Sequence, residues 1–301
     1  MSLKVDHLTK TFGEKVAVDN ISFEMTEPGV FGLIGTNGAG KTTTIRMILG
    51  IMGADSGSAV WNGKPITRET LAFGYMPEER GIYMKNKVLE QLVYFGMLRG
   101  TNRTDAKKSA LRLMERLGVS EYKDMLAEKL SKGNQQKIQL MAALISEPEF
   151  LILDEPLSGL DPVNTDLFKG IIREEIAKNK YLIMSSHQMP TIEEFCTDIT
   201  IMNRGQAVLQ GNLNAIKKGY GRVNLFVKSD SEIAPYIQKF GIQIVAKMPS
   251  EYHLKVTDER QAREFLASMM QDNVPLVKFE LREPSLHEIF VEKVGDDNEE
   301  R

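Results

Sequence analysis

The sequence predicts an α/β fold built on a parallel sheet, followed by a small α+β domain. Three observations predict it. The apolar run Gly29–Ile34 has the character of a buried strand, and a glycine-rich loop joins it to a segment with helical spacing. A second apolar run, Phe150–Leu153, ends in two carboxylates. From about Arg222, short strand and helix patterns alternate at the spacing of a separate small domain.

The glycine-rich loop carries the most specific motif in the chain. It comprises Gly35, Thr36, Asn37, Gly38, Ala39, Gly40, Lys41 and Thr42, with Thr43 directly behind it. The pattern G-x-x-x-x-G-K-T is that of a phosphate-binding loop, in which backbone N–H groups converge on an anion. Lys41 can reach the β- and γ-phosphates of a nucleotide, and the Thr42 hydroxyl can ligate Mg²⁺. An ordinary glycine-rich turn would match by chance in on the order of one chain in a hundred, so the loop predicts nucleotide binding.

Composition excludes several classes of protein. The chain has 301 residues, 42% of them hydrophobic and 26% charged, which is ordinary for a globular protein of one or two domains. Its net charge of -3 gives no basic surplus, so we expect no nucleic-acid partner. The single Cys196 excludes an intramolecular disulfide and fits a reducing compartment. No apolar run approaches the roughly 18 residues that span a bilayer, and no signal peptide precedes the first strand pattern, so we expect a cytoplasmic location.

The chain before the loop predicts a hairpin. Two strand patterns, residues 3–8 and 17–23, flank a polar turn that contains Phe12. An aromatic side chain at a hairpin tip is typical of a surface on which something flat stacks. The alternative is an aromatic side chain that folds onto its own sheet.

Helical patterns dominate residues 87–146, which we interpret as an inserted helical subdomain. Its last helix begins after Ser131, Lys132, Gly133 and Asn134. Ser131 is a suitable N-cap residue, and on local sequence alone this start is an ordinary capped helix.

The two carboxylates after the second apolar run are Asp154 and Glu155. They stand at the carboxyl end of a predicted parallel strand, where ligands bind in α/β sheets. Asp154 suits a contact to Mg²⁺ through water, and Glu155 is placed to accept a proton from an attacking water. A solvated acidic turn is the alternative. His187 ends the next apolar strand, 181–186, and so lies on the same rim, although a lone histidine is more often structural.

The ordered set of motifs resembles the ATPase subunit of an ABC transporter. The set consists of the phosphate loop, Leu-Ser-Lys-Gly-Asn from Leu130, Leu-Asp-Glu-Pro from Leu153, Ser-Gly-Leu-Asp from Ser158, and Ser-His at 186–187. The resemblance covers about residues 3–218. It implies a P-loop ATPase that binds ATP and Mg²⁺ and works as a homodimer, or as a pair with a related ATPase. It also implies a membrane permease as partner, with the chain peripheral to the inner face of the membrane.

The resemblance assigns roles to individual residues. Phe12 would stack on adenine, and Asn37 would lie near the γ-phosphate. Thr42 would hold Mg²⁺ directly and Asp154 through water. Glu155 would be the general base, and His187 would contact the γ-phosphate. The segment 131–134 would reach the ATP of the other subunit, and Asp161 would cross to that subunit.

The chain departs from the family pattern at two places, which bear on the roles assigned to the residues there. The signature usually reads Leu-Ser-Gly-Gly-Gln, whereas Lys132 and Asn134 occupy its third and fifth places here. Glu78 stands where the family usually has a glutamine near the metal. The run Gly74–Gly81 resembles a bacterial exporter subgroup that includes sodium-efflux ATPases, which favours export.

The domain organisation follows from these patterns. We expect an ATPase domain at 1–220, an accessory α+β domain at 221–295 and an acidic tail at 296–301. The order β-α-β-β-α-β in the accessory domain is typical of a ferredoxin-like fold, which assigns no function by itself. The segment Pro284–Phe290 resembles the C-terminal accessory segment of the same exporter subgroup.

The leading hypothesis is an ATP-hydrolysing motor subunit of an exporter. Candidate residues for contact with the permease are Ile82, Tyr83, Val93, Tyr94 and Phe95, some of which core packing explains equally well. The alternatives are a soluble ABC ATPase that acts on nucleic acid or ribosomes, and a subunit that senses ATP without turnover. A GTPase is disfavoured because the chain lacks the Asn-Lys-x-Asp motif that reads guanine.

Overall fold

The computed structural model describes residues 1–67, 70–79, 81–249 and 251–295. The chain divides into two compact units, 1–210 and 211–301. This boundary lies before the expected one at 220, because helix α7 (Leu213–Tyr220) is tied to the second unit. The Tyr220 hydroxyl donates a hydrogen bond to Glu292 of α10 (Leu286–Gly295). The expected acidic tail, 296–301, falls outside the described residues.

A six-stranded sheet forms the centre of the first unit, in the order β10-β9-β3-β8-β7-β6. Its strands are β3 (Gly29–Ile34), β6 (Phe73–Met76), β7 (Phe150–Asp154), β8 (Tyr181–Ser186), β9 (Asp198–Asn203) and β10 (Gln206–Asn212). Strands β9, β3, β8, β7 and β6 all pair in parallel, as the apolar runs predicted. Their carboxyl ends therefore meet at one edge of the sheet.

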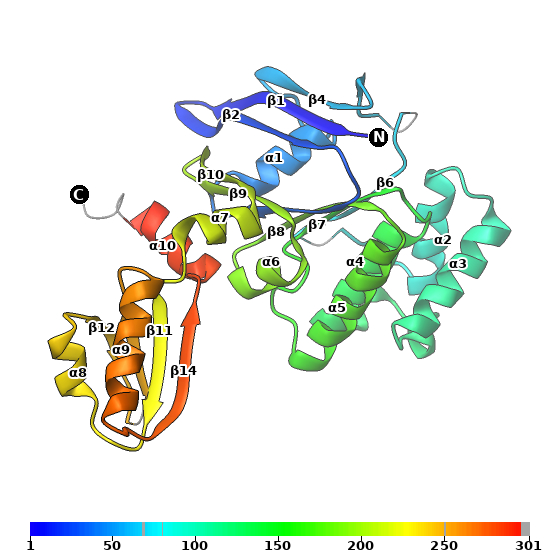
Figure 1. Cartoon of the computed structure of the whole chain (residues 1–301). Helices are drawn as coiled ribbons and strands as arrows, with labels where there is room; N and C mark the ends of the chain where they lie inside the picture. The colour runs from blue at the N-terminus through cyan, green and yellow to red at the C-terminus, as the bar shows by residue number, and fades with distance from the viewer. Residues whose placement is uncertain (68–69, 80, 250, 296–301) are drawn as a thin grey trace. The chain divides into compact units, whose positions relative to one another are not determined.

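A smaller antiparallel sheet lies over helix α1 (Lys41–Ile48), as Figure 1 shows. It contains β1 (Leu3–Phe12), β2 (Lys15–Met25), β4 (Ser56–Trp61) and β5 (Lys64–Pro65). The predicted hairpin is confirmed as β1 and β2, which extend further than expected and turn directly after Phe12. Ile45 and Ile48 of α1 share one core with side chains of both sheets, so α1 is held between them.

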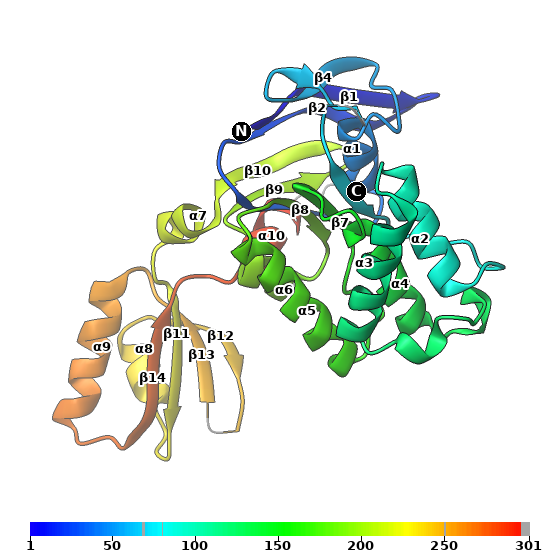
Figure 2. The same ribbon diagram turned by 90° about the vertical axis from the view of Figure 1, so that its right-hand side faces the viewer.

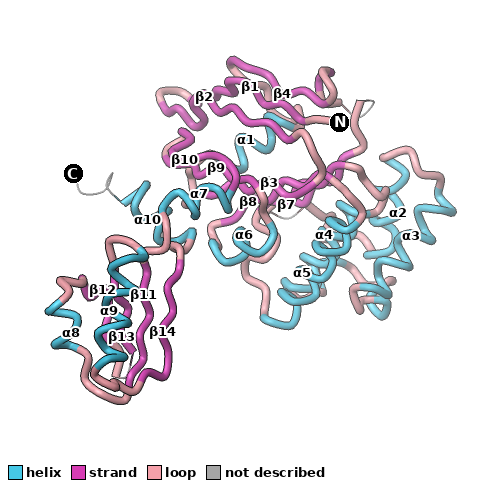
Figure 3. Tube along the Cα trace, viewed as in Figure 1, coloured by secondary structure: helices cyan, strands magenta, loops and turns pink. Residues whose placement is uncertain are grey.

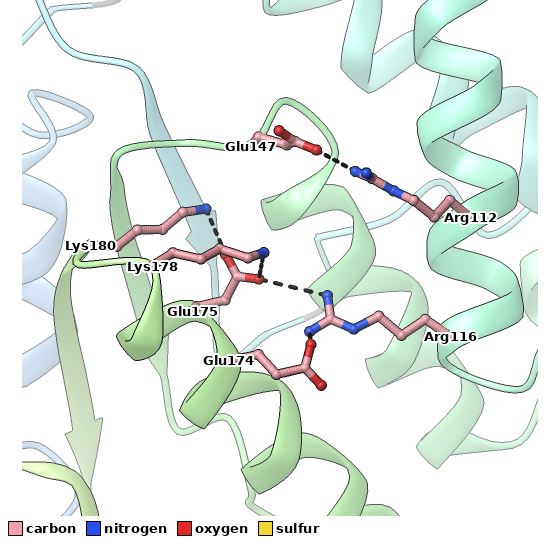
Figure 4. Close-up of polar contacts among 7 residues, drawn as sticks. All are labelled: Arg112, Arg116, Glu147, Glu174, Glu175, Lys178 and Lys180. Carbon is pink, nitrogen blue, oxygen red and sulfur yellow. Dashed lines mark hydrogen bonds and ion pairs between the residues drawn. The ribbon is translucent and has the colours of Figure 1, made fainter.

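The opposite face of the six-stranded sheet carries α4 (Lys132–Leu144), α5 (Pro162–Ala177) and α6 (Met189–Phe195), as Figures 1 and 2 show. The predicted helical insertion contains α2 (Val88–Leu98), α3 (Arg103–Arg116), the short 3₁₀ helices η1 (Ser120–Tyr122) and η2 (Ala127–Lys129), and α4. Polar contacts fasten α3 to its neighbours (Figure 4). They involve Arg112, Arg116, Glu147, Glu174, Glu175, Lys178 and Lys180.

The second unit has the predicted β-α-β-β-α-β order. Its strands are β11 (Asn224–Ser229), β12 (Gln243–Lys247), β13 (Glu251–Lys255) and β14 (Leu276–Arg282), with helices α8 (Ala234–Lys239) and α9 (Glu259–Gln271). All neighbouring strands are antiparallel, in the order β12-β13-β11-β14 (Figures 2 and 3). Leu225, Leu254 and Phe265 belong to a separate core between the sheet and its helices.

Three helices of the two units were not predicted, and a fourth helix is shorter than expected. Helix α8 is shorter than the expected 231–240, because the Ser231 N–H donates to the Ser229 hydroxyl and forms a turn before it. Helices α6, α7 and α10 were not predicted. Each has ten residues or fewer, which gives at most about three turns of apolar spacing.

Candidate functional site

Four chain segments leave the same edge of the six-stranded sheet. The glycine-rich loop follows β3, Glu78 follows β6, Asp154 ends β7, and His187 follows β8. Since these strands are parallel, the sheet brings together residues that are more than 100 positions apart in sequence. The predicted site residues of these segments share one rim.

The loop backbone requires glycine at two positions. Gly40 has a φ of 105°, which L side chains rarely adopt, and a Cβ there would lie 2.5 Å from the Ala17 carbonyl oxygen. A Cβ on Gly35 would lie 2.5 Å from the Met202 carbonyl oxygen. The loop therefore packs directly against the backbone of β2 and β9, and its residues up to Lys41 curl into the N-terminus of α1.

The loop opens on a pocket of about 460 Å³. Its walls are Phe12, Lys15, Ala17, Glu78 and the run Thr36–Thr43. Phe12 is 49% exposed at the tip of the β1–β2 hairpin, so it does not fold onto its own sheet. An exposed aromatic ring and a glycine-rich anion site therefore line one cavity.

Lys41 is buried at the base of this pocket. Its ammonium donates hydrogen bonds to the carbonyl oxygens of Gly35 at 2.8 Å and Thr36 at 3.4 Å. It also lies 3.2 Å from Oε1 of Glu155, and both side chains of this pair are almost entirely enclosed. The cation is thus held by the loop backbone and by one carboxylate.

Asp154 is fully buried and accepts hydrogen bonds at both carboxylate oxygens. The Thr42 hydroxyl donates to Oδ2 at 2.8 Å, and the Ser185 hydroxyl donates to Oδ1. Burial raises the pKa of Asp154, whereas the two hydrogen bonds oppose that rise. Ser185 was not among the predicted site residues. The sequence signal that could have identified Ser185 is its position at the polar end of strand 181–186, two residues before His187.

Glu155 lies between the glycine-rich loop and the end of β8, and it contacts a residue of each. Its Oε2 lies 2.9 Å from Nδ1 of His187, while its Oε1 faces Lys41. Its backbone has a φ of 51°, an uncommon conformation for a residue with a side chain. The Glu155 N–H donates to the Ser185 carbonyl oxygen at 3.2 Å and to the Ser185 hydroxyl at 3.1 Å, which holds this strained turn in place.

Glu78 adds a third carboxylate to the rim. Burial raises the pKa of Glu78, and the charges of Asp154 and Glu155 raise it further, while the Lys41 charge lowers it. Three carboxylates therefore face one buried ammonium. This surplus of negative charge would be relieved by a bound cation.

The oxygen donors present fit Mg²⁺ better than a softer metal. Magnesium prefers oxygen ligands, keeps several waters, and is usually bound through one or two carboxylates together with substrate phosphates. Thr42, Asp154 and Glu78 offer a hydroxyl and two carboxylates of this kind. The described residues contain no cluster of three or more His, Cys, Asp or Glu side chains arranged to hold a metal by themselves. A metal at this edge would therefore depend on phosphate oxygens as well.

The predicted signature segment lies apart from this pocket within the chain. Ser131 caps α4 by accepting a hydrogen bond from the Asn134 N–H at 3.3 Å, and neither residue lines the pocket. The Lys132 ammonium lies against Gly159, and the Gln136 amide donates to the Ser158 carbonyl oxygen at 2.8 Å. The start of α4 is thereby fastened to the loop that follows Glu155.

Asp161 occupies the N-cap position of α5. Its side chain accepts hydrogen bonds from the backbone N–H of Asn164 at 3.0 Å and from the Asn164 side-chain amide at 2.5 Å. These bonds lower the pKa of Asp161. The residue is exposed, so its carboxylate both caps the helix and faces outward.

Two protein families match the chain. The ABC transporter family matches residues 18–158, and the C-terminal domain of DrrA1-3-like ATP-binding proteins matches residues 211–294. The second match begins at the boundary between the two structural units.

Individual proteins resemble the chain over much of its length. It is 43% identical over 294 residues to the uncharacterized ABC transporter ATP-binding protein YhaQ of Bacillus subtilis (strain 168), covering 97% of this chain and 98% of that protein. It is 30% identical to Nod factor export ATP-binding protein I of Paraburkholderia xenovorans (strain LB400), covering 79% and 82%. A solved structure of the ATP-binding subunit of an ABC transporter superimposes with a TM-score of 0.67 at 27% identity, covering 73% of this chain and 93% of that one.

Proposed function

This chain belongs to the family of ABC transporter ATP-binding proteins, and we propose that it is the ATP-hydrolysing motor of an exporter. The observation that carries hydrolysis is the position of Glu155. A carboxylate at the strand end next to the phosphate loop has one oxygen on Lys41 and the other on His187. A carboxylate placed between the lysine of the phosphate loop and His187 favours hydrolysis over ATP sensing alone.

The nucleotide would lie in the pocket of the phosphate loop. Its phosphates would take the backbone N–H groups of residues 36–43, and its adenine would stack on the exposed ring of Phe12. Lys41 would exchange the Gly35 carbonyl oxygen and Glu155 for the β- and γ-phosphates, because the phosphate charge exceeds that of one carboxylate.

Release of Lys41 would leave Glu155 free to accept a proton from water. His187 would retain the orientation of this carboxylate and face the γ-phosphate. Thr42 would hold Mg²⁺ directly, and Asp154 and Glu78 would accept hydrogen bonds from waters bound to the ion. The bound ion would neutralise part of the phosphate charge. All of these groups except the metal belong to the same edge of the sheet, so little rearrangement of the backbone is required.

A second copy, or a related ATPase, would complete the site. The start of α4, residues 131–134, has the backbone N–H groups of a helix N-terminus but lies apart from the pocket of its own chain. We propose that it contacts the nucleotide of the partner, and that the outward carboxylate of Asp161 crosses to that partner.

Export through a membrane permease is supported by the relatives. One of them is named for Nod factor export, and the second unit matches a domain of DrrA1-3-like ATP-binding proteins. In the described part of the chain, no helix is long and apolar enough to cross a membrane. From the names of these relatives, we propose that the chain sits on the inner face of the membrane and drives a separate permease. In inside-out vesicles that contain both chains, ATP-dependent uptake of the solute is expected, and ATP-dependent loss would indicate import.

The decisive experiment compares the wild type with Glu155→Gln. ATP hydrolysis with Mg²⁺ and ATP-dependent mass by light scattering are measured on both proteins. The wild type is expected to turn over slowly. The variant should hydrolyse ATP at least about 100-fold more slowly, because a general base typically accelerates a reaction by that factor or more. It should also accumulate as an ATP-bound dimer.

Other outcomes would refute parts of this proposal. A variant that hydrolyses ATP as fast as the wild type would remove Glu155 from the role of general base. If neither protein dimerises with ATP at high concentration, even with the permease present, the roles proposed for Ser131 and Asp161 are wrong. ATP binding without turnover under the same conditions would favour an ATP-sensing subunit.

A further inference from the structure

A buried hydroxyl without a partner lies on β6. The Tyr75 Oη is shielded from solvent and has no hydrogen-bond partner among the residues that the structure describes. Buried polar groups are normally hydrogen-bonded, so an exception at the edge of a site calls for an explanation. Tyr75 has no role in the function proposed above.

The strand register places this side chain on the face of the sheet that carries Asp154. Tyr75 pairs with Ile152 of β7, and side chains two positions apart in a strand point to the same face. Asp154 therefore projects on the same side as Ile152 and Tyr75. Tyr75 also packs against the core that contains Ile152 and Ile45 of α1, which identifies this face as the one covered by α1.

The charges around the hydroxyl agree with this placement. Burial raises the pKa of Tyr75 to about 12. The Asp154 carboxylate, which is near enough to act on the hydroxyl both through its charge and as an acceptor, contributes to the rise, and Arg46 of α1 opposes it. The hydroxyl therefore keeps its proton at neutral pH and is a hydrogen-bond donor.

Asp154 has the capacity to accept another bond. Its two oxygens accept one hydroxyl each, from Thr42 and Ser185, and a carboxylate has about four acceptor positions. Thr42 is the residue that would turn toward a metal. A third donor on the same face would then hold Asp154 in its orientation.

We propose that Tyr75 is a positioning residue for Asp154, to which its hydroxyl donates a hydrogen bond when nucleotide and metal are bound. The inference rests on the proposed function, because it assigns Asp154 to the metal side of the nucleotide site. Hydrogen bonds to the groups that surround a metal site set the orientation of those groups, and loss of such a partner typically costs 10- to 100-fold in metal affinity.

The test measures binding of a fluorescent ATP analogue to the full chain, in EDTA and across a Mg²⁺ titration. Tyr75→Phe removes only the hydroxyl. We expect a rise of about 10-fold in the Mg²⁺ concentration that gives half of the Mg²⁺-dependent increase in analogue binding. The affinity for the analogue in EDTA should stay unchanged. The melting temperature should change little, because the hydroxyl makes no hydrogen bond of good geometry in this structure. In an Asp154→Asn background, the added Tyr75→Phe change should have no further effect.

Tyr181→Phe is the matched control, since the Tyr181 hydroxyl donates to the Met1 carbonyl oxygen at 2.6 Å, at the start of β8. It should leave the Mg²⁺ dependence unchanged. An unchanged Mg²⁺ dependence in Tyr75→Phe would overturn the inference, as would equal weakening in EDTA or an undiminished effect beside Asp154→Asn. A wild type that binds no nucleotide would instead contradict the proposed function itself.

Discussion

Glu175 on α5 shows how a buried charge is stabilised in this protein. Its side chain is 2% exposed and accepts hydrogen bonds from Lys178 at 2.7 Å and Lys180 at 2.6 Å (Figure 4). Arg116 of α3 lies 3.6 Å from the same carboxylate. Burial alone would raise the pKa of Glu175, but the two lysines outweigh burial and lower it.

We predict that Glu175→Gln lowers the free energy of unfolding by on the order of 2 kcal/mol at pH 7, the usual size for hydrogen bonds to a charged group. A depressed carboxyl pKa stabilises the fold above the unfolded value of 4.5, and this contribution disappears as the pH falls through the folded pKa. Urea unfolding of both proteins from pH 7 to pH 4 should show the difference shrinking below about pH 4.5.

Glu264→Gln is the control for this prediction. Glu264 pairs with Arg260 at 2.9 Å on the exposed face of α9, and such surface pairs contribute little. A difference between Glu175→Gln and wild type that persists unchanged at acid pH would show that packing, rather than charge, accounts for the loss.

At the scale of elements, helix α2 and the segment before it contain both buried and exposed apolar residues, which the sequence alone did not distinguish. Val93 and Ile82 are buried, so these two candidates for contact with the permease belong to the core. Tyr94 is 47% exposed and Tyr83, in the segment before α2, is 49% exposed. Their rings form one cluster with Phe95, whose ring is stacked 5.5 Å from that of Tyr83.

We predict that this aromatic cluster contacts the permease. The double change Tyr83→Asp and Tyr94→Asp should abolish co-purification of the two chains, because it places charge in an apolar contact. ATP binding by the isolated chain should stay unchanged, since neither residue lines the nucleotide pocket. Val163→Asp is the control, as Val163 is an exposed apolar residue on α5. Undiminished co-purification of the double variant would place the contact elsewhere.

At the scale of the whole molecule, each of the two units has its own core. The core of 1–210 joins both sheets to α1, and the core of 211–295 joins β11, β13, α8 and α9. All the residues proposed for the nucleotide site belong to the first unit. Binding of ATP by the first unit alone is therefore expected.

We predict that a chain ending at residue 210 folds and binds ATP with the affinity of the full chain, within about twofold. Circular dichroism, thermal melting and titration with a fluorescent nucleotide check this. Residues 211–295 produced alone should also melt cooperatively. Loss of ATP binding in a folded 1–210 fragment would show that the second unit contributes to the site.

The sequence by itself determined the identity of the reactive groups. The spacing from Gly35 to Thr42 has a single structural meaning after an apolar strand, and the carboxylates 154 and 155 end a run too apolar to be anything but a buried strand. Motifs of this kind can be recognised because they depend only on residues that are adjacent in sequence. The parallel sheet and the succession of strands and helices along the second unit were predictable from local patterns of the same kind.

Tertiary structure alone decided which groups meet. Ser185 contacts Asp154, and His187 contacts Glu155, although these pairs come from different strands. Tyr75 lies on the same face of the sheet as Asp154. Only the pairing of β6, β7 and β8 fixes these positions. Burial likewise separated Val93 from Tyr94, because helical spacing shows a face but not what covers it. The short helices α6, α7 and α10 depend on tertiary packing, since helices of that length are marginal by themselves.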